Sequence, residues 1–267
     1  MILASASPLT VTLALGASAA YAASAAGASR AGPTLSRTAV WLAWSLHGML
    51  LAWGLWGSEP RFGFAPALSV TAWLVGLVYA VESHFYPQLR TSWLLSGVAS
   101  AAVLLALLFP GNTLQPSASA WLPLHWALGI ASYGLFAVAV VHAWLMTRAE
   151  ARMRMAASAS AGLPLLTMER LTFRFVSLGF VLLSATLLAG FFFGNQLYGA
   201  SHAIKWDHKT AFSVLSWLTF AVLMVGRFRF GWRGKQAVRV LYVGTGLLLL
   251  AYVGSRFVME VMLGRTL

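Results

Sequence analysis

A short polar stretch, residues 201–210, carries the side chains of this chain that could do chemistry. It holds two lysines, an aspartate, two histidines and a tryptophan, whereas only 9% of the whole chain is charged. Long apolar runs flank it on both sides. Because polar groups beside a membrane interior are costly, a cluster of them indicates a functional site. Histidine is the commonest neutral ligand of metals and of haem iron, so the stretch predicts a ligand site.

The composition indicates which elements must position this stretch. The chain has 267 residues, of which 60% are hydrophobic, and its mean hydropathy is +0.78. Eight apolar segments are each long enough to cross about 30 Å of hydrocarbon as a helix. They cover residues 8–27, 38–57, 66–86, 92–110, 123–147, 173–194, 210–228 and 236–260. We therefore predict an all-α fold, a polytopic membrane helix bundle of about eight transmembrane helices, in a single transmembrane domain over residues 1–267.

The basic residues indicate how the bundle is oriented. Of the 18 Lys and Arg residues, 13 follow spans one, three, five and seven, and 5 lie on the opposite side. Cytoplasmic loops carry the excess of Lys and Arg, so both termini are predicted outside and the 201–210 stretch on the external face. The net charge of +12 has the same explanation, and we expect no nucleic-acid partner. The absence of cysteine excludes disulfides and thiolate metal sites.

The N-terminal segment has small residues around Ala20-Tyr21-Ala22-Ala23, as a signal peptide would. A signal peptide also needs a positively charged start, and no Lys or Arg precedes Arg30. We therefore expect a retained first span.

The longest cytoplasmic loop is predicted over residues 148–172. Its first part, residues 148–155, is basic and is expected to continue the fifth helix. Residues 156–162 are small and polar, which is typical of a flexible linker.

Three histidines converge on the predicted external rim. His125 opens span five, His208 opens span seven, and His202 lies in the looser chain before it. Two neutral imidazoles on separate helices can bind one haem iron from opposite faces, and His125 with His208 suits this best. The alternative is that all three are interfacial histidines that face water.

The neighbours of His208 have roles of their own. Asp207 is expected to cap the helix that starts there, which does not exclude a part in the site. Lys209 could pair with carboxylates of an anionic cofactor or be solvated. Trp126 and Trp206 fit an aromatic belt at the interface, or they could wall a flat aromatic ligand by stacking.

Four ionisable residues elsewhere form a second group of candidates. His84 and His142 lie at similar depths in spans three and five, with Glu82 near His84. Together they could form an inner site, or Glu82 and His84 could lie at the interface. His47 lies deepest, and both function and a packing hydrogen bond to a neighbouring helix are open for it.

Several motifs in the second half of the chain occur in a familiar order. The motifs are His125-Trp126-Ala127-Leu128-Gly129, Leu188-Ala189-Gly190, Trp206-Asp207-His208-Lys209, Gly231-Trp232-Arg233-Gly234 and Ala251-Tyr252-Val253-Gly254-Ser255. With these motifs in this order, the chain resembles the cytochrome c assembly family of membrane proteins (CcsA/CcmC-like), and most closely its HemX/YpjD-like branch. The resemblance covers about residues 120–260.

The resemblance implies haem handling at the external face. Larger members of the family hold haem with a tryptophan-rich segment and two flanking histidines. His125 matches the first histidine, and Trp206-Asp207 matches the end of the tryptophan-rich segment. The rest of that segment is missing here, the family has Pro in place of His208, and no histidine follows His208. We therefore expect no synthetase-type enzyme and a rearranged His125/His208 pair of axial ligands.

The most favoured function is a haem-binding protein of the bacterial inner membrane that assists cytochrome c assembly. Its expected partners are haem, the lipid bilayer and other cytochrome c biogenesis or membrane proteins. A b-type electron-transfer subunit is the alternative that two histidine pairs would favour. A proton-coupled small-molecule transporter is the alternative that Glu82 and His47 would favour, although no pair of broken spans recurs in matching halves.

Overall fold

The computed structural model describes residues 7–27, 33–56, 61–85, 92–113, 121–154, 165–198 and 207–264. Its contacts divide the chain into two compact units. Unit 1 comprises Met1–Gln115 with Arg256–Leu267, and unit 2 comprises Pro116–Ser255.

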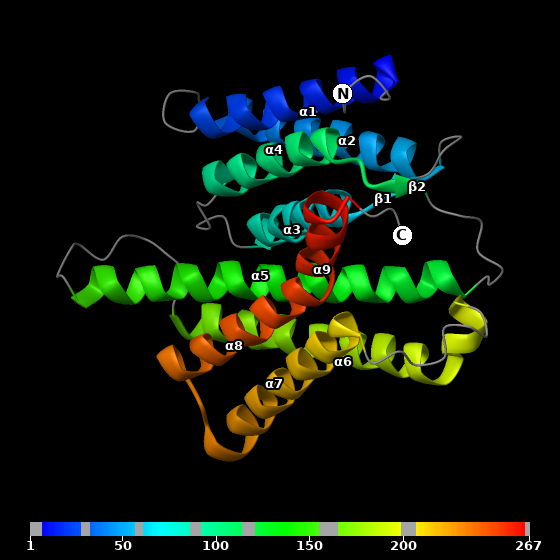
Figure 1. Ribbon diagram of the computed structural model, residues 1–267. Coiled ribbons are helices and arrows are strands. Elements are labelled where there is room, and N and C mark those ends of the chain that lie inside the picture. Colours follow the sequence, from blue (N-terminus) through cyan, green and yellow to red (C-terminus); the bar gives the residue numbers. More distant parts are fainter. Residues whose placement is uncertain are drawn as a thin grey trace. The chain divides into compact units, whose positions relative to one another are not determined.

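Helices make up nearly all of both units (Figure 1). Unit 1 begins with α1 (Pro8–Gly27), α2 (Pro33–Trp56), β1 (Arg61–Phe62), α3 (Phe64–Phe85), α4 (Ser92–Leu108) and β2 (Asn112–Thr113). Unit 2 contains α5 (Leu122–Arg154), α6 (Leu165–Tyr198), α7 (His208–Phe230), α8 (Gly234–Leu249) and the π-helical turn η3 (Leu250–Gly254). The same helix continues through α9 (Ser255–Phe257) and a second π-helical turn, η4 (Val258–Met262).

The lengths of these helices confirm an all-α, polytopic membrane helix bundle. Among the described residues, seven helices are long and apolar enough to cross a membrane. The apolar part of α4, Leu94–Leu108, is shorter than these seven. The eight spans expected from the sequence require that α4 also crosses the membrane.

The two longest helices differ in how well the sequence predicted them. As expected, α5 continues through the basic residues to Arg154. We expected the sixth span to begin at residue 173, but α6 begins at Leu165, so that boundary was wrong. The added turns contain the buried Glu169, whose carboxylate accepts a hydrogen bond from Arg227 of α7. This ion pair stabilises helix beyond the apolar segment. Residues 156–162, the predicted linker, lie outside the described residues.

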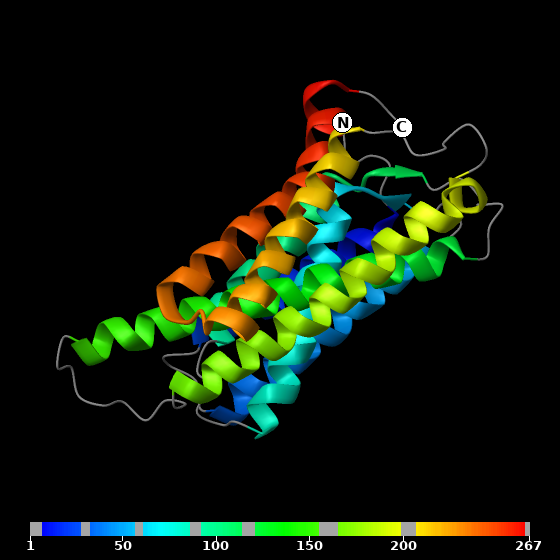
Figure 2. The same ribbon diagram turned by 90° about the horizontal axis from the view of Figure 1, so that it is seen from below.

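The turn between α7 and α8 needs glycine at three positions, two for their backbone conformation and one for close packing. Gly231 ends α7 with φ of 65°, and Gly234 begins α8 with φ of 56°, a left-handed conformation that other residues rarely adopt. Between them, the Trp232 backbone N–H donates to the Gly226 carbonyl at 3.0 Å. A Cβ at Gly226 would lie 2.3 Å from the Trp232 ring, so only glycine fits there. Figure 2 shows α7 and α8 running side by side from this turn.

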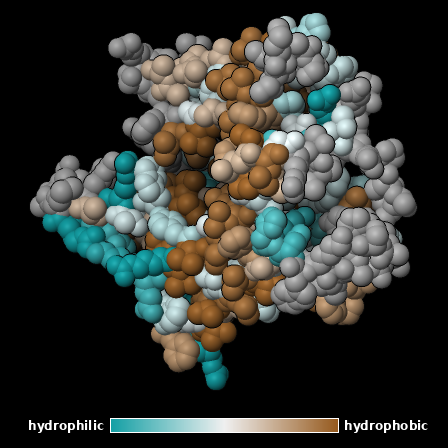
Figure 3. Space-filling model, viewed as in Figure 1, coloured by the Kyte–Doolittle hydropathy of each residue, from teal (hydrophilic) through white to brown (hydrophobic). Residues whose placement is uncertain are grey.

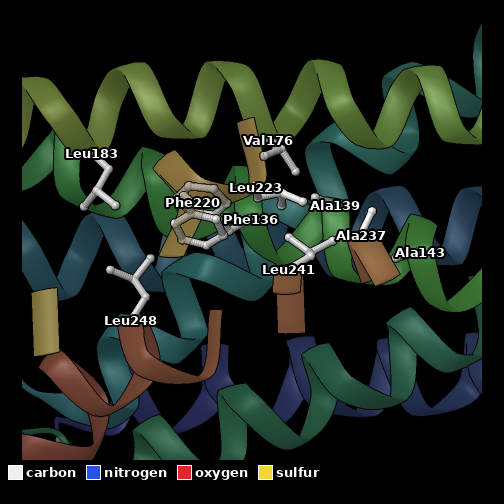
Figure 4. Close-up of a cluster of buried hydrophobic side chains, with 10 residues drawn as sticks. All are labelled: Phe136, Ala139, Ala143, Val176, Leu183, Phe220, Leu223, Ala237, Leu241 and Leu248. Atoms are coloured by element: carbon white, nitrogen blue, oxygen red, sulfur yellow. The ribbon is translucent and has the colours of Figure 1, made fainter. Parts of the chain in front are cut away.

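The core of unit 2 is built from four helices. The rings of Phe136 on α5 and Phe220 on α7 stack with centroids 3.8 Å apart (Figure 4). A Cβ at Gly244 of α8 would lie 2.8 Å from the Phe220 ring, so the glycine lets α8 approach α7. The Ser216 hydroxyl donates to the Gly244 carbonyl at 2.8 Å and fixes the same contact. Small residues and interhelical hydrogen bonds of this kind hold membrane helices together.

The core of unit 1 includes the first helix of the chain. Ala14, Ala17 and Tyr21 of α1 are buried against α2 and α4. Ser18 of α1 shares a buried hydrogen bond of 2.8 Å with Ser100 of α4. These contacts place α1 in the core of unit 1, and its retention as a first span stays a prediction.

A two-stranded ladder in unit 1 was not expected from the sequence. It is antiparallel and pairs Arg61 with Thr113 and Phe62 with Asn112. Gly111, with φ of 80°, lies so close to the Phe62 backbone that a Cβ would approach it to 2.5 Å. Two residues a strand are too few to give the alternating pattern by which strands are recognised in a sequence.

The surface matches a membrane protein. Figure 3 shows broad hydrophobic areas over the helices and hydrophilic residues gathered at the C-terminal end of α5. That end carries the exposed Arg148 and Arg154. The Arg148 guanidinium lies 4.1 Å from the centre of the Trp144 ring, as expected for paired groups at an interface.

Candidate functional site

The start of α7 is fixed by Asp207. Its backbone is extended, with φ of −87° and ψ of 169°, and its Oδ1 accepts the Thr210 backbone N–H at 2.8 Å. This confirms the predicted helix cap. Partial burial alone would raise the pKa of Asp207, but the hydrogen bonds from Thr210 and the nearby charge of Lys209 lower it. The carboxylate is therefore held in its charged form at the helix N-terminus.

His208 is the first residue of α7 and its side chain is exposed. Its Nε2 shares a hydrogen bond of 2.8 Å with the hydroxyl Oγ of Ser255. Ser255 begins α9 directly after the π-helical turn η3. The imidazole at the start of α7 is thus held by the residue that follows η3 on the last helix.

Lys209 connects two other side chains at the same end of unit 2. Its Nζ lies 5.7 Å from the centre of the Tyr252 ring, within the range of a cation–π contact. Its positive charge also acts on the His125 imidazole. Lys209 therefore lies where it could balance a negative charge beside His125.

His125 lies in the first turn of α5 and is half-buried. Its ring atom Cε1 would be 3.6 Å from a Cβ at Gly190 of α6, an ordinary van der Waals distance, so the imidazole lies beside α6 at Gly190. Trp126 is half-buried in the same turn.

These contacts bring several predicted site residues to one end of unit 2, where α5 and α7 begin and α8 ends. We call this group the rim cluster. Within the described ranges, no group of three or more His, Cys, Asp or Glu side chains could hold a metal ion, so at most two such ligands meet here. Trp206 and His202 lie outside the described residues. The rim cluster consists of His125, Asp207, His208, Lys209, Tyr252 and Ser255.

Sequence reasoning gave no role to two members of the rim cluster. Tyr252 and Ser255 were noted only as parts of a family motif. They lie three residues apart on the last helix, and η3 directly precedes Ser255. π-helical turns inside α-helices are frequent at functional sites, but no residue pattern in the sequence indicates them.

The deep histidine, His47, lies in a different environment. It is completely buried in unit 1. Its Nε2 lies 2.8 Å from Ser69 Oγ of α3, and its Nδ1 lies 3.4 Å from the Tyr21 hydroxyl of α1. The side chain thus connects three helices through hydrogen bonds, which matches the packing alternative.

The predicted inner pair is divided between the two units. His142 of α5 is buried in unit 2, and its ring meets Phe175 edge to face at 5.4 Å. His84 belongs to α3 in unit 1, and its side chain lies outside the described residues. Glu82 is buried in the same helix. A joint site of these residues stays a prediction.

Apolar helices of membrane-spanning length define a multi-pass membrane protein. The family model described as "Cytochrome C assembly protein" matches residues 35–263. The chain therefore belongs to the cytochrome c assembly family, and the match extends well before residue 120, where we expected the resemblance to begin.

Individual relatives agree with this. The inner membrane protein YpjD of Escherichia coli K12 is 27% identical over 194 residues, which are 70% of this chain and 72% of YpjD. A 28.8 kDa protein of Azospirillum brasilense is 29% identical over 80% of this chain and 82% of its own length. The cytochrome c biogenesis protein CcsA of Prochlorococcus marinus is 30% identical, over 34% of this chain and 28% of CcsA. No solved structure matches. The protein is a multi-pass inner-membrane protein, and its family supports a role in cytochrome c biogenesis.

Proposed function

We propose that this protein binds haem at the rim cluster and assists cytochrome c assembly by holding or passing it. The observation that supports this is that Lys209, the residue next to His208 on α7, acts electrostatically on His125 of α5 at one end of unit 2. These side chains come from two helices that are separate in sequence.

The chemistry of the rim cluster fits a haem. Imidazole nitrogens are common ligands of haem iron, and His125 and His208 would hold the iron here. Lys209 would hold a propionate by a charge-assisted hydrogen bond. Trp126 and Trp206 would cover the flat ring, and Asp207 fixes the start of α7 on which His208 depends. When bound, the haem would supply redox and electron-transfer chemistry, while the protein supplies binding and orientation.

The proposal includes the orientation of the chain in the membrane. Most Lys and Arg residues follow the odd-numbered spans, which supports both termini outside and the rim cluster on the external face. We further propose that α4 crosses the membrane as an eighth span and that both units act in one membrane domain. We assign no catalytic residue, so the protein would act as a carrier rather than as a synthetase, with other biogenesis proteins as its partners.

A haem titration of the purified protein tests the assigned ligands. We expect a Soret band with about one haem per chain, and a loss of about tenfold or more in affinity in His125→Ala and His208→Ala. His202→Ala, which removes a histidine that we leave out of the pair, is the matched control. Unchanged haem binding in both single variants would contradict the assignment. Two haems per chain would favour the b-type cytochrome instead.

A further inference from the structure

The hydrogen bond between His208 and Ser255 engages a particular ring nitrogen. It is the nitrogen farther from the backbone, Nε2, that lies 2.8 Å from Ser255 Oγ. Because a porphyrin is wide and flat, its iron reaches the outer nitrogen of an imidazole more easily than Nδ1, which is crowded by the atoms next to Cβ. The contact therefore occupies the nitrogen that suits haem iron.

The direction of this hydrogen bond does not change the conclusion. If the Ser255 hydroxyl donates, it uses the lone pair of Nε2. If Nε2–H donates to Ser255 Oγ, that nitrogen carries a proton and has no lone pair in the ring plane. In both cases iron can bind Nε2 only after the bond to Ser255 has broken.

The position of Ser255 is set by the helix that carries it. Ser255 follows η3, and Tyr252 within η3 contacts Lys209, the residue next to His208. Two neighbouring residues of α7 thus meet two residues of the last helix. This double contact holds Ser255 opposite His208.

We propose that Ser255 is a latch that holds His208 Nε2 in the haem-free protein and competes with iron for it. This rests on the proposed haem site, and it adds regulation of that site. The latch lowers haem affinity and favours the released state, as suits a protein that passes haem on rather than keeping it. Because His208 is exposed, the bond can be exchanged without burying an unsatisfied group.

The test compares haemin titrations of the full-length protein in detergent. Ser255→Ala should bind haemin about two- to fivefold more tightly than the wild type, since one modest hydrogen bond no longer competes. Ser255→Thr retains the hydroxyl and should bind like the wild type. Ser213→Ala, which removes another serine hydroxyl from unit 2, is the matched control. Unchanged or weaker binding in Ser255→Ala would overturn the latch.

A second measurement uses no haem, so it separates the latch from the proposed function. Diethyl pyrocarbonate modifies unprotonated imidazole nitrogens, and mass spectrometry gives its rate at each histidine. We expect His208 to react about two- to fivefold faster in Ser255→Ala, with His125 unchanged as the internal control. Equal rates at His208 in the two proteins would refute the latch even if haem binds. If His208→Ala leaves haemin binding unchanged while His208 reacts faster in Ser255→Ala, the haem pair is refuted but the hydrogen bond is supported.

Discussion

Two histidines of this protein have the same contact and opposite surroundings. In unit 1, His47 Nε2 lies 2.8 Å from Ser69 Oγ, and in unit 2, His208 Nε2 lies 2.8 Å from Ser255 Oγ. His47 is completely buried, whereas His208 is exposed. The atoms and the distance are the same, but His47 is shielded from water and has Tyr21 as a second partner, whereas His208 is open to water.

That difference decides what each contact can do. A buried imidazole that loses its serine has no water to replace it, so breaking the bond costs the full penalty of an unsatisfied polar group. An exposed imidazole exchanges its serine for water at little cost, and a metal can then take its place. A histidine–serine pair is thus structural in the interior and exchangeable at the rim.

The largest effect is expected from His47→Ala. The change opens a cavity and leaves the hydroxyls of Tyr21 and Ser69 without their imidazole partner, which lowers the free energy of unfolding by about 3 kcal/mol. Thermal unfolding in detergent measures this. Haem bound per folded chain should stay at the wild-type level, because the rim cluster belongs to unit 2.

Ser69→Ala provides the graded control for this prediction. It removes only one interhelical hydrogen bond and should cost about 1 kcal/mol. A stable His47→Ala protein that has lost haem would contradict the comparison, because the buried histidine would then act in binding.

A smaller loss is expected from Asp207→Ala at neutral pH. The change removes the cap at the start of α7, and the expected cost is about 1 kcal/mol of unfolding free energy. Asp207→Asn keeps a capping side chain without the charge, so it should lose less. Chemical unfolding followed by circular dichroism distinguishes the three proteins.

The unfolding free energy lost in Asp207→Ala should depend on pH in one direction. The pKa of Asp207 is lowered in the folded protein, so its charged form adds stability above its ordinary pKa of 3.8. That contribution disappears as the pH falls through the lower, folded value. The difference between wild type and Asp207→Ala should therefore be constant from pH 7 to 5 and shrink below pH 4. A difference that grows in acid would contradict this assignment.

The smallest effect is expected from Lys209→Gln, which tests the electrostatic part of the rim. Haemin affinity should fall about two- to threefold at low salt, because an exposed ion pair contributes well under 1 kcal/mol. At about 1 M salt the two proteins should bind alike, since screening removes the contribution. Lys235→Gln at the other end of unit 2 is the control. An equal loss in that variant would indicate a non-specific charge effect.

Much of the fold follows from apolar length alone. The eight predicted segments each fall largely within an observed helix, and α1 has the predicted limits, residues 8 and 27. The start of α6 was missed because its first turns are stabilised by the ion pair of Glu169 with Arg227, which are distant in sequence. The ladder of β1 and β2 was missed for a similar reason, since Gly111 approaches Phe62 only in the folded chain.

The rim cluster was predictable only in part. The cap by Asp207 is a local interaction over three residues, so the sequence indicates it directly. Ser255 is 47 residues from its partner His208, and its orientation depends on a π-helical turn. Neither the contact between residues 47 positions apart nor the extra residue of the π-helical turn can be recognised from composition or periodicity.

The π-helical turn η3 sets which face of the last helix carries Ser255, whereas the residue types of the rim cluster set its chemistry. Such a turn holds one residue more than an α-helical turn would, so deleting one residue from Leu250–Gly254 would restore regular helix. The helix beyond that deletion would keep its direction, whereas deleting one apolar residue from the regular helix α8 would rotate Ser255 by about 100° and turn it away from His208. Every side chain of the rim cluster outside the deletion would still be present, with the same net charge. The contact between the two helices therefore depends on the length of the last helix as much as on the residues it carries.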